Sequence, residues 1–150
     1  MNTHYETRRE NFLISTDKSL LQIAVIHGFL SSSYWASTRA KETTECAIAN
    51  SLCFGVYDGT KQIGFARVVT DYAVFAYLGD VFIVPEYQGQ GLSKWLMEVM
   101  LSHPELQGLR RWSLATKDAH GLYAQFGFTA PVFPERWMER PAKDAYVKTQ

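Results

Sequence analysis

Two glycines near the middle of the chain give the clearest chemical signal in the sequence. Gly89 and Gly91 lie between a β-type run that ends at Pro85 and an amphipathic helix pattern that begins at Leu92. A helix start exposes four backbone N–H groups, and glycine lets a ligand approach the backbone closely. This arrangement is typical of a site that binds an anion.

The first turn of the expected helix also lacks the acids that usually offset the positive end of a helix dipole. Between Tyr87 and Met97 the sequence has no acid, and Lys94 stands where the dipole disfavours a cation. These features favour an external anion, and a solvated turn with a lysine is the plainer alternative. The turn matches neither the P-loop nor the dinucleotide fingerprint, which would need a third glycine where Lys94 stands.

Composition limits the classes of protein and partner that fit. At 150 residues, with 47% hydrophobic and 20% charged residues, the sequence fits one soluble domain spanning 1–150. The 15 basic and 15 acidic residues balance, so we expect no nucleic-acid or membrane partner. No apolar run resembles a signal peptide or membrane span, which favours a cytoplasmic protein. Cys46 and Cys53 form neither a disulfide framework nor a metal spacing, so no metal is expected.

The elements that must position the glycine turn form an α+β pattern: helices, then a β meander, then helix, strand and helix. Apolar residues at helical spacing predict that the helix after Gly91 packs on the sheet. The expected strands are 10–16, 51–57, 62–71, 73–84 and 109–116, with weaker candidates at 128–133 and 143–148. The expected helices are 18–29, with Asp17 as N-cap and an end near Gly28, 39–50, one from Leu92, and a short one around 118–126.

Two stretches resemble motifs of the GCN5-related N-acetyltransferases, the GNAT superfamily. "VFIVPEY" followed by Gln88-Gly89-Gln90-Gly91-Leu92-Ser93 is similar to the family's acyl-CoA-binding motif, with Ser93 in place of Gly or Ala. "TKDAHGLYAQFGF" at 116–128 resembles a second family motif, with Thr116 where Asn is frequent. The resemblance implies a small, bacterial-type, single-domain member with a mixed, mostly antiparallel, twisted sheet flanked by helices.

The resemblance also implies that the anion is the pyrophosphate of acetyl-CoA. Backbone N–H groups from Gly89 to Lys94 would hold it, and the pantetheine arm would lie along the preceding strand. The residues expected to bind the co-substrate are Phe82, Ile83, Val84, Gln88, Gly89, Gln90, Gly91, Leu92, Ser93, Lys94 and Thr116.

Acetyl transfer to an amine needs a proton acceptor for the amine, a donor to the carbonyl oxygen and an acid for the leaving thiolate. Tyr123 stands at the family's usual acid position, and packing in the core is its alternative role. Asp80 is a candidate base or anchor for the substrate ammonium, with a purely structural role as the alternative. His120 and His27 are rival bases, and an N–H near Ile83 and Val84 is the expected carbonyl donor.

The acceptor side is less defined. Tyr34 and Trp35 fall in a loop that often lines the acceptor site in this family, and their faces could meet a cationic amine. The same pair could instead fill the core or a dimer contact. Arg67 could pair with Asp71 or with an acid of the substrate.

The sequence therefore predicts an N-acetyltransferase that moves acetyl from acetyl-CoA to a primary amine by direct attack in a ternary complex. A small-molecule amine is favoured over a peptide or protein because the aromatic residues suggest an enclosed site. An acyl-CoA sensor without turnover and a nucleotide-binding domain are the alternatives. A homodimer through residues 134–140 is possible, and the acceptor, acyl length, base and oligomeric state stay open.

Overall fold

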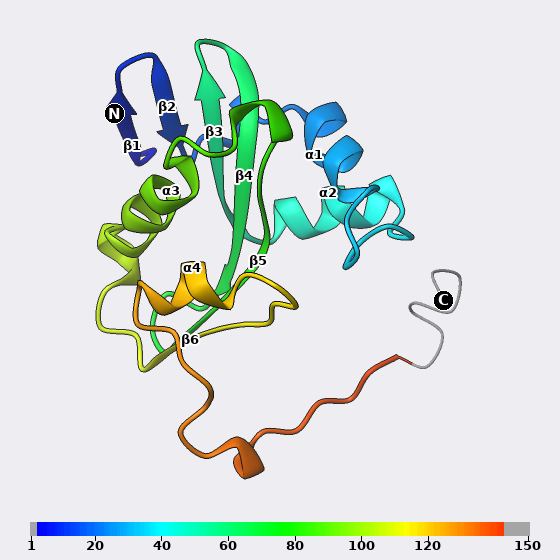
Figure 1. Cartoon of the computed structure of the whole chain (residues 1–150), viewed down its shortest axis with the longest axis vertical. Helices are drawn as coiled ribbons and strands as arrows, with labels where there is room; N and C mark the ends of the chain where they lie inside the picture. The colour runs from blue at the N-terminus through cyan, green and yellow to red at the C-terminus, as the bar shows by residue number, and fades with distance from the viewer. Residues whose placement is uncertain (1–2, 143–150) are drawn as a thin grey trace.

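The computed structural model describes residues 3–142, and these contain one six-stranded mixed sheet (Figure 1). The strands follow one another across the sheet in chain order. The strands are β1 (Glu6–Arg9), β2 (Phe12–Ser15), β3 (Leu52–Asp58), β4 (Lys61–Thr70), β5 (Phe75–Ile83) and β6 (Arg111–Leu114). The α-helices are α1 (Ile23–Leu30), α2 (Lys41–Ala49), α3 (Leu92–Leu101) and α4 (His120–Ala124), and short 3-10 helices cover Lys18–Leu20, Pro85–Tyr87, Pro104–Leu106 and Pro134–Arg136.

Every neighbouring pair of strands is antiparallel except β5 and β6, which are parallel. A parallel pair needs a crossover connection, and α3 supplies it. The expected α+β architecture, the central three-strand meander and the final helix–strand–helix order are confirmed.

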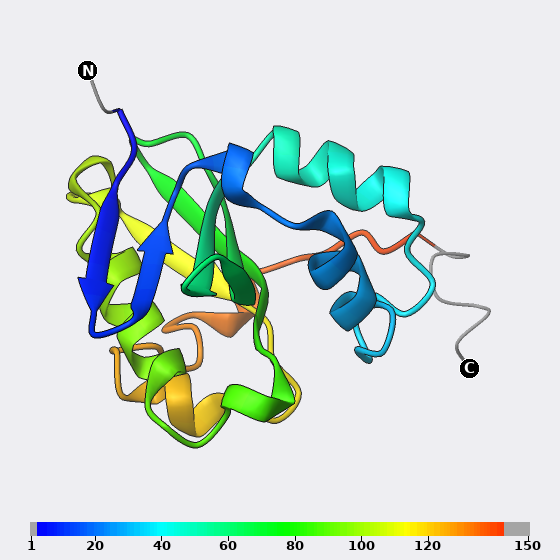
Figure 2. The same ribbon diagram turned by 90° about the horizontal axis from the view of Figure 1, so that it is seen from above.

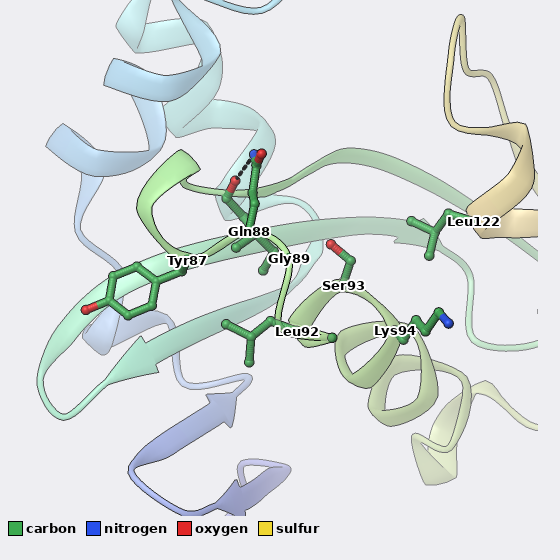
Figure 3. A pocket seen from close by; sticks show the side chains of 9 residues that line it. Tyr87, Gln88, Gly89, Leu92, Ser93, Lys94 and Leu122 are labelled. Carbon is green, nitrogen blue, oxygen red and sulfur yellow. Dashed lines mark hydrogen bonds between the residues drawn. The ribbon is translucent and has the colours of Figure 1, made fainter.

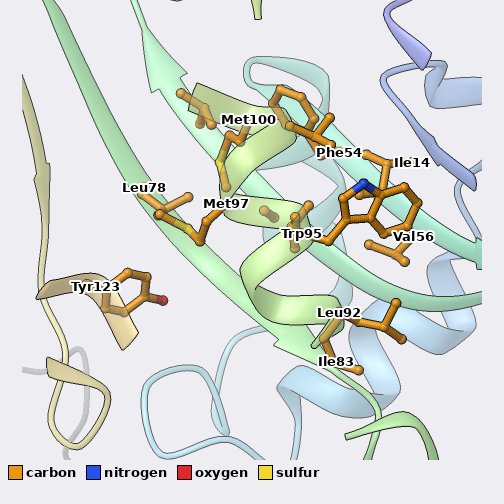
Figure 4. Close-up of a cluster of buried hydrophobic side chains, with 14 of the residues drawn as sticks. Ile14, Phe54, Val56, Leu78, Ile83, Leu92, Trp95, Met97, Met100 and Tyr123 are labelled. Carbon is orange, nitrogen blue, oxygen red and sulfur yellow. The ribbon is translucent and has the colours of Figure 1, made fainter. Parts of the chain in front are cut away.

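One apolar stripe packs α3 against the sheet, as its spacing predicts. Leu92, Trp95, Leu96, Val99 and Met100 are each at most 5% exposed. They meet inward-facing residues of the strands in the larger of two buried clusters (Figure 4). Burial of this size is the main contribution that holds α3 on the sheet.

The opposite face of the sheet carries α1 and α2 (Figure 2). Ile26 and Leu30 of α1 pack there with Phe65 and Phe82 of the sheet. Phe82 also stacks on Phe29, with ring centroids 4.2 Å apart. The sheet therefore separates two helical layers, and a ligand that reaches both must pass its edge or an opening between strands.

The N-terminal region differs from the sequence prediction in two ways. A strand, β1, precedes the expected one and forms a hairpin with β2. The expected helix over 18–29 breaks at Leu21 and Gln22, both in extended conformation. The break has a tertiary cause, because the Gln22 N–H donates to the side chain of Gln62 at 2.7 Å, and the Gln62 N–H donates to that of Gln22 at 3.1 Å. Asp17 does cap the first short helix, accepting from the Ser19 N–H, and α1 runs past Gly28 to Leu30.

The region after α4 contains no strand within the described residues. Residues 128–133 were expected to form one, but Pro131 removes a ladder donor in the middle of the segment. The chain beyond it extends away from the sheet, with Val132 and Met138 exposed (Figure 1). The other weak candidate, 143–148, lies outside the described residues.

Candidate active site

The sheet opens where β5 and β6 part. Their pairing covers only Phe75–Leu78 against Arg111–Leu114, whereas β5 continues to Ile83. Across the last part of β5, no other strand of residues 3–142 pairs on that side. Asp80, with a φ of 53°, lies where the β4–β5 register shifts, so the strand is irregular as it enters the opening.

The backbone at the end of β5 has one group that faces this opening. The Val84 N–H donates to the Ile63 carbonyl at 2.8 Å, so it cannot serve as the expected carbonyl donor. Strand groups alternate in direction, so the amide of Ile83 points away from β4 and toward the opening. The Ile83 carbonyl accepts from the side-chain amide of Gln88 at 2.8 Å.

The glycine turn forms a pocket of about 300 Å³ beside this strand end (Figure 3). Gly89 and Gly91 have φ angles of 84° and 82°, a left-handed conformation that disfavours other residues. Gly91 is the N-cap of α3; no side chain of the described residues caps this helix, and its first turn contains no acid. The exposed N–H groups and the nearby Lys94 can therefore hold an anion.

Most of the expected donor residues meet in this pocket. Phe82, Val84, Gln90 and Thr116 do not line it. Phe82 turns its ring to the opposite face, and the Thr116 hydroxyl accepts from the Ala119 N–H at 3.0 Å. The residues that line the pocket are Ile83, Tyr87, Gln88, Gly89, Gly91, Leu92, Ser93, Lys94 and Leu122, of which Tyr87 and Leu122 were not predicted.

Tyr123 lies on α4, next to Leu122 of this pocket. Its ring is 9% exposed and packs edge-on against Phe128. Burial, then the nearby Tyr34 and Asp118, raise the pKa of Tyr123 above its ordinary value of 10.0. Its hydroxyl forms no hydrogen bond with another described residue. A protonated hydroxyl with an unused donor is suited to protonate a leaving thiolate.

Asp80 is held by three side-chain donors. Its Oδ1 accepts from Trp35 Nε1 at 2.9 Å, and its Oδ2 accepts from Arg39 at 2.8 Å and Arg67 at 2.9 Å. Burial raises the pKa of Asp80, but the hydrogen bond from Arg39 and the charges of both arginines outweigh it and leave the pKa below 3.8. The geometry disfavours both expected roles, base and ammonium anchor, because two guanidinium groups already neutralise the carboxylate.

The loop between α1 and α2 reaches over the opening. Trp35 binds Asp80 of β5, and its neighbour Tyr34 accepts a 2.8 Å hydrogen bond from the Lys117 N–H. The two rings meet edge-on with centroids 5.1 Å apart. The aromatic pair thus links β5 to the segment before α4, next to Tyr123.

Two residues that hold this loop in place were not predicted from the sequence. Arg39 and Lys117 gave no signal, because their partners lie 41 and 83 residues away in the chain. Arg67 was left undecided and pairs with Asp80 and Ser51. Of the rival bases, His120 borders a larger hollow of about 1120 Å³ that it shares with Tyr123 and Thr116. His27 lies on α1, and its buried Nδ1 has no hydrogen-bond partner among residues 3–142.

The sequence of residues 49–130 matches the family model of the acetyltransferase (GNAT) domain. This chain belongs to the GNAT family. A crystal structure of a GNAT-family acetyltransferase from Xanthomonas campestris pv. campestris shares 53% identity, with a TM-score of 0.87 over 91% of this chain and 96% of that one. A protein from Gibberella zeae that is named as an acetyltransferase is 35% identical over 140 residues, covering 78% of each chain.

More distant structures share the GNAT fold alone. A GNAT-family acetyltransferase from Elizabethkingia anophelis, whose structure has acetyl-CoA bound, is 13% identical, with a TM-score of 0.64 and 91% of each chain covered. Among residues 3–142 no group of three or more His, Cys, Asp or Glu is placed to hold a metal. No helix in that part of the chain is long and apolar enough to cross a membrane.

Proposed function

We propose that this GNAT protein transfers an acetyl group from acetyl-CoA directly to the nitrogen of an amine. The observation that carries the proposal is the meeting of three features at one opening of the sheet. These are the helix start at Gly91, the Ile83 amide that faces the opening, and the Tyr123 hydroxyl, which bonds no residue of 3–142. Family membership and relatives named as acetyltransferases support it.

Acetyl-CoA fits the donor side by charge and shape. The backbone of residues 89–94 and the ammonium of Lys94 offer positive potential for a pyrophosphate. The Ile83 N–H can bind an extended amide chain laid along the open edge of β5. Acetyl-CoA is bound in the structures of two distant proteins that share this fold, which supports it as the co-substrate.

The chemistry follows from the positions of Tyr123 and the open strand edge. The amine nitrogen forms a bond to the carbonyl carbon, and the carbon–sulfur bond breaks as the thiolate leaves. Tyr123 donates its proton to that thiolate, and its raised pKa keeps the proton available at neutral pH. Because Asp80 is engaged, the amine loses its proton to water and attacks in its neutral form.

The test is an assay of CoA release with acetyl-CoA and a broad panel of amines, peptides and proteins. We expect turnover with at least one amine and a mass increase of one acetyl group on that product. Binding of acetyl-CoA without any acetylated product would support an acyl-CoA sensor instead. Calorimetric titration completes the test, because tighter binding of ADP than of acetyl-CoA would overturn the assignment of the co-substrate.

A further inference from the structure

Two arginines and one aspartate form a charged cluster at the start of the sheet opening. Arg39 comes from the end of the α1–α2 loop, Arg67 from β4 and Asp80 from β5. Both guanidinium groups bind the same carboxylate oxygen, Oδ2, so the cluster has a net charge of one positive unit. Trp35 occupies the other oxygen, so Asp80 has no oxygen left without a donor.

The guanidinium groups are only partly used. Arg67 donates through Nε to Asp80 and through Nη1 to Ser51, and Arg39 donates through Nη1 alone. Each group has five N–H donors, so each keeps several that no described residue accepts. The arginine side chains are 20% and 15% exposed, so a small ligand can still reach them.

The cluster is connected through its neighbours to the groups that we propose to react. A Cβ at Gly79 would lie 3.6 Å from Nη2 of Arg67, so this nitrogen lies directly over the residue that follows the last β5–β6 pair. Trp35 connects the cluster to Tyr34, and Tyr34 lies close enough to Tyr123 to affect its pKa. At the far side of the opening, Lys117 and Asp118 carry opposite charges that offset each other.

We propose that Arg39 and Arg67 bind a carboxylate on the acceptor, so that the substrates are free α-amino acids or close analogues. This inference rests on the proposed acetyl transfer. A half-buried positive cluster gains most from a planar anion that takes two N–H donors at once. The same net charge repels polyamines and lysine-rich peptides.

The state of the amine supports the same substrate class. With Asp80 engaged, the acceptor must reach its neutral form without that carboxylate as a base. When its carboxylate pairs with the two guanidinium groups, a free amino acid no longer stabilises its own ammonium as strongly, so binding lowers the pKa of its amine toward the reference of about 8 for a peptide α-amino group. The positive cluster lowers the pKa of a nearby amine further.

The test compares amino acids with the amines that decarboxylation would make from them. The pairs are phenylalanine and phenethylamine, tyrosine and tyramine, and leucine and isopentylamine, with spermidine and a lysine peptide as cationic acceptors. We expect the preferred amino acid to exceed its partner amine in kcat/KM by roughly 10- to 100-fold, the range for one charged hydrogen-bonded contact. Preference for spermidine, the lysine peptide or the decarboxylated amines would overturn the proposal while acetyl transfer stands.

Variants separate recognition from support of the fold. Arg67→Gln and Arg39→Gln should reduce the ratio of kcat/KM for the amino acid to kcat/KM for its amine toward 1. They should raise KM for the amino acid and leave the affinity for acetyl-CoA unchanged. Arg8→Gln, on exposed β1, is the matched control. Equal loss for both members of a pair would mean that the arginines only hold the loop on the sheet.

A binding measurement covers the case of slow turnover or a poorly folded variant. CoA-saturated protein is titrated with N-acetylphenylalanine and with N-acetylphenethylamine, using the wild type and Arg39→Lys, which keeps the charge. The proposal is supported if the protein binds N-acetylphenylalanine but not N-acetylphenethylamine, and if Arg39→Lys weakens that binding only modestly. Equal binding of both products contradicts the proposal. If no amine in the panel is acetylated, both this proposal and the proposed acetyl transfer are refuted.

Discussion

The hydroxyl of Tyr34 accepts a 2.8 Å hydrogen bond from the main-chain N–H of Lys117, 83 residues further along the chain. This contact joins the α1–α2 loop to the segment that leads into α4. The Lys117 ammonium also lies 5.4 Å from the centroid of the Tyr34 ring. The two sides of the sheet opening are therefore tied together directly over the place where donor and acceptor would meet.

Loss of the hydrogen bond between Tyr34 and Lys117 should weaken binding of the amine and leave binding of acetyl-CoA unchanged. We expect Tyr34→Phe to lower kcat/KM for the acceptor about 3- to 10-fold, which corresponds to one net hydrogen bond of roughly 1 kcal/mol. The free energy of unfolding should change by less than about 1 kcal/mol, because Tyr34 is 49% exposed. Steady-state kinetics with calorimetry of acetyl-CoA binding test this, and a large loss of acetyl-CoA affinity would contradict the assignment to the acceptor side.

Asp80 should matter for stability rather than for proton transfer. Asp80→Asn leaves two guanidinium groups without their counter-ion, and breaking such a buried pair costs about 3 kcal/mol. The folded pKa lies below 3.8, so the carboxylate stabilises the fold above that pH and loses its effect as pH falls through the folded pKa. The deficit of the variant should be constant from about pH 5 to 8 and shrink in acid.

Denaturant unfolding at several pH values measures this, with exposed Glu45→Gln on α2 as the control. The rates of the wild type and of Asp80→Asn should depend on pH in the same way. A well-folded Asp80→Asn protein that loses most of its activity, together with the fall in rate at acid pH, would show instead that Asp80 is the base.

The helix start at Gly91 should control binding of acetyl-CoA. Gly91→Glu places negative charge where the pyrophosphate would lie and forces a side chain into a φ of 82°, so binding should be lost. Gly28→Glu adds the same charge to α1, where a Cβ meets no atom of the described residues within 4 Å. Calorimetric titration of both variants decides the point, and unchanged affinity in a folded Gly91→Glu protein would refute the anion site.

The pocket at the glycine turn, which we propose as the donor side, could be predicted because its signals are local. The glycines, the acid-free first turn and Lys94 are neighbours in the chain, and a helix start forms its anion site from its own backbone. The meander and the buried stripe of α3 follow from periodicity alone, and both were predicted correctly.

The charged cluster that we propose as the acceptor side could not be predicted because it depends on pairs that are distant in the chain. Nothing near Arg39 indicates that it binds Asp80, 41 residues later. The break in the helix at Gln22 has the same origin, since its partner Gln62 is 40 residues away. Such tertiary hydrogen bonds override local preference. For the same reason the sequence suggested that Asp80 is a free acid, whereas in the structure its carboxylate binds Trp35 and two arginines.

The central claim is that Tyr123 supplies the proton to the leaving thiolate. We predict that Tyr123→Phe binds acetyl-CoA with wild-type affinity, yet has a kcat reduced roughly 100-fold or more, the usual contribution of a positioned acid. Since the pKa of Tyr123 is raised above 10.0, the wild-type rate should not fall with this group below pH 10. Measurement of kcat for the best amine in both proteins tests the claim most directly. Equal kcat values in wild type and Tyr123→Phe would contradict it.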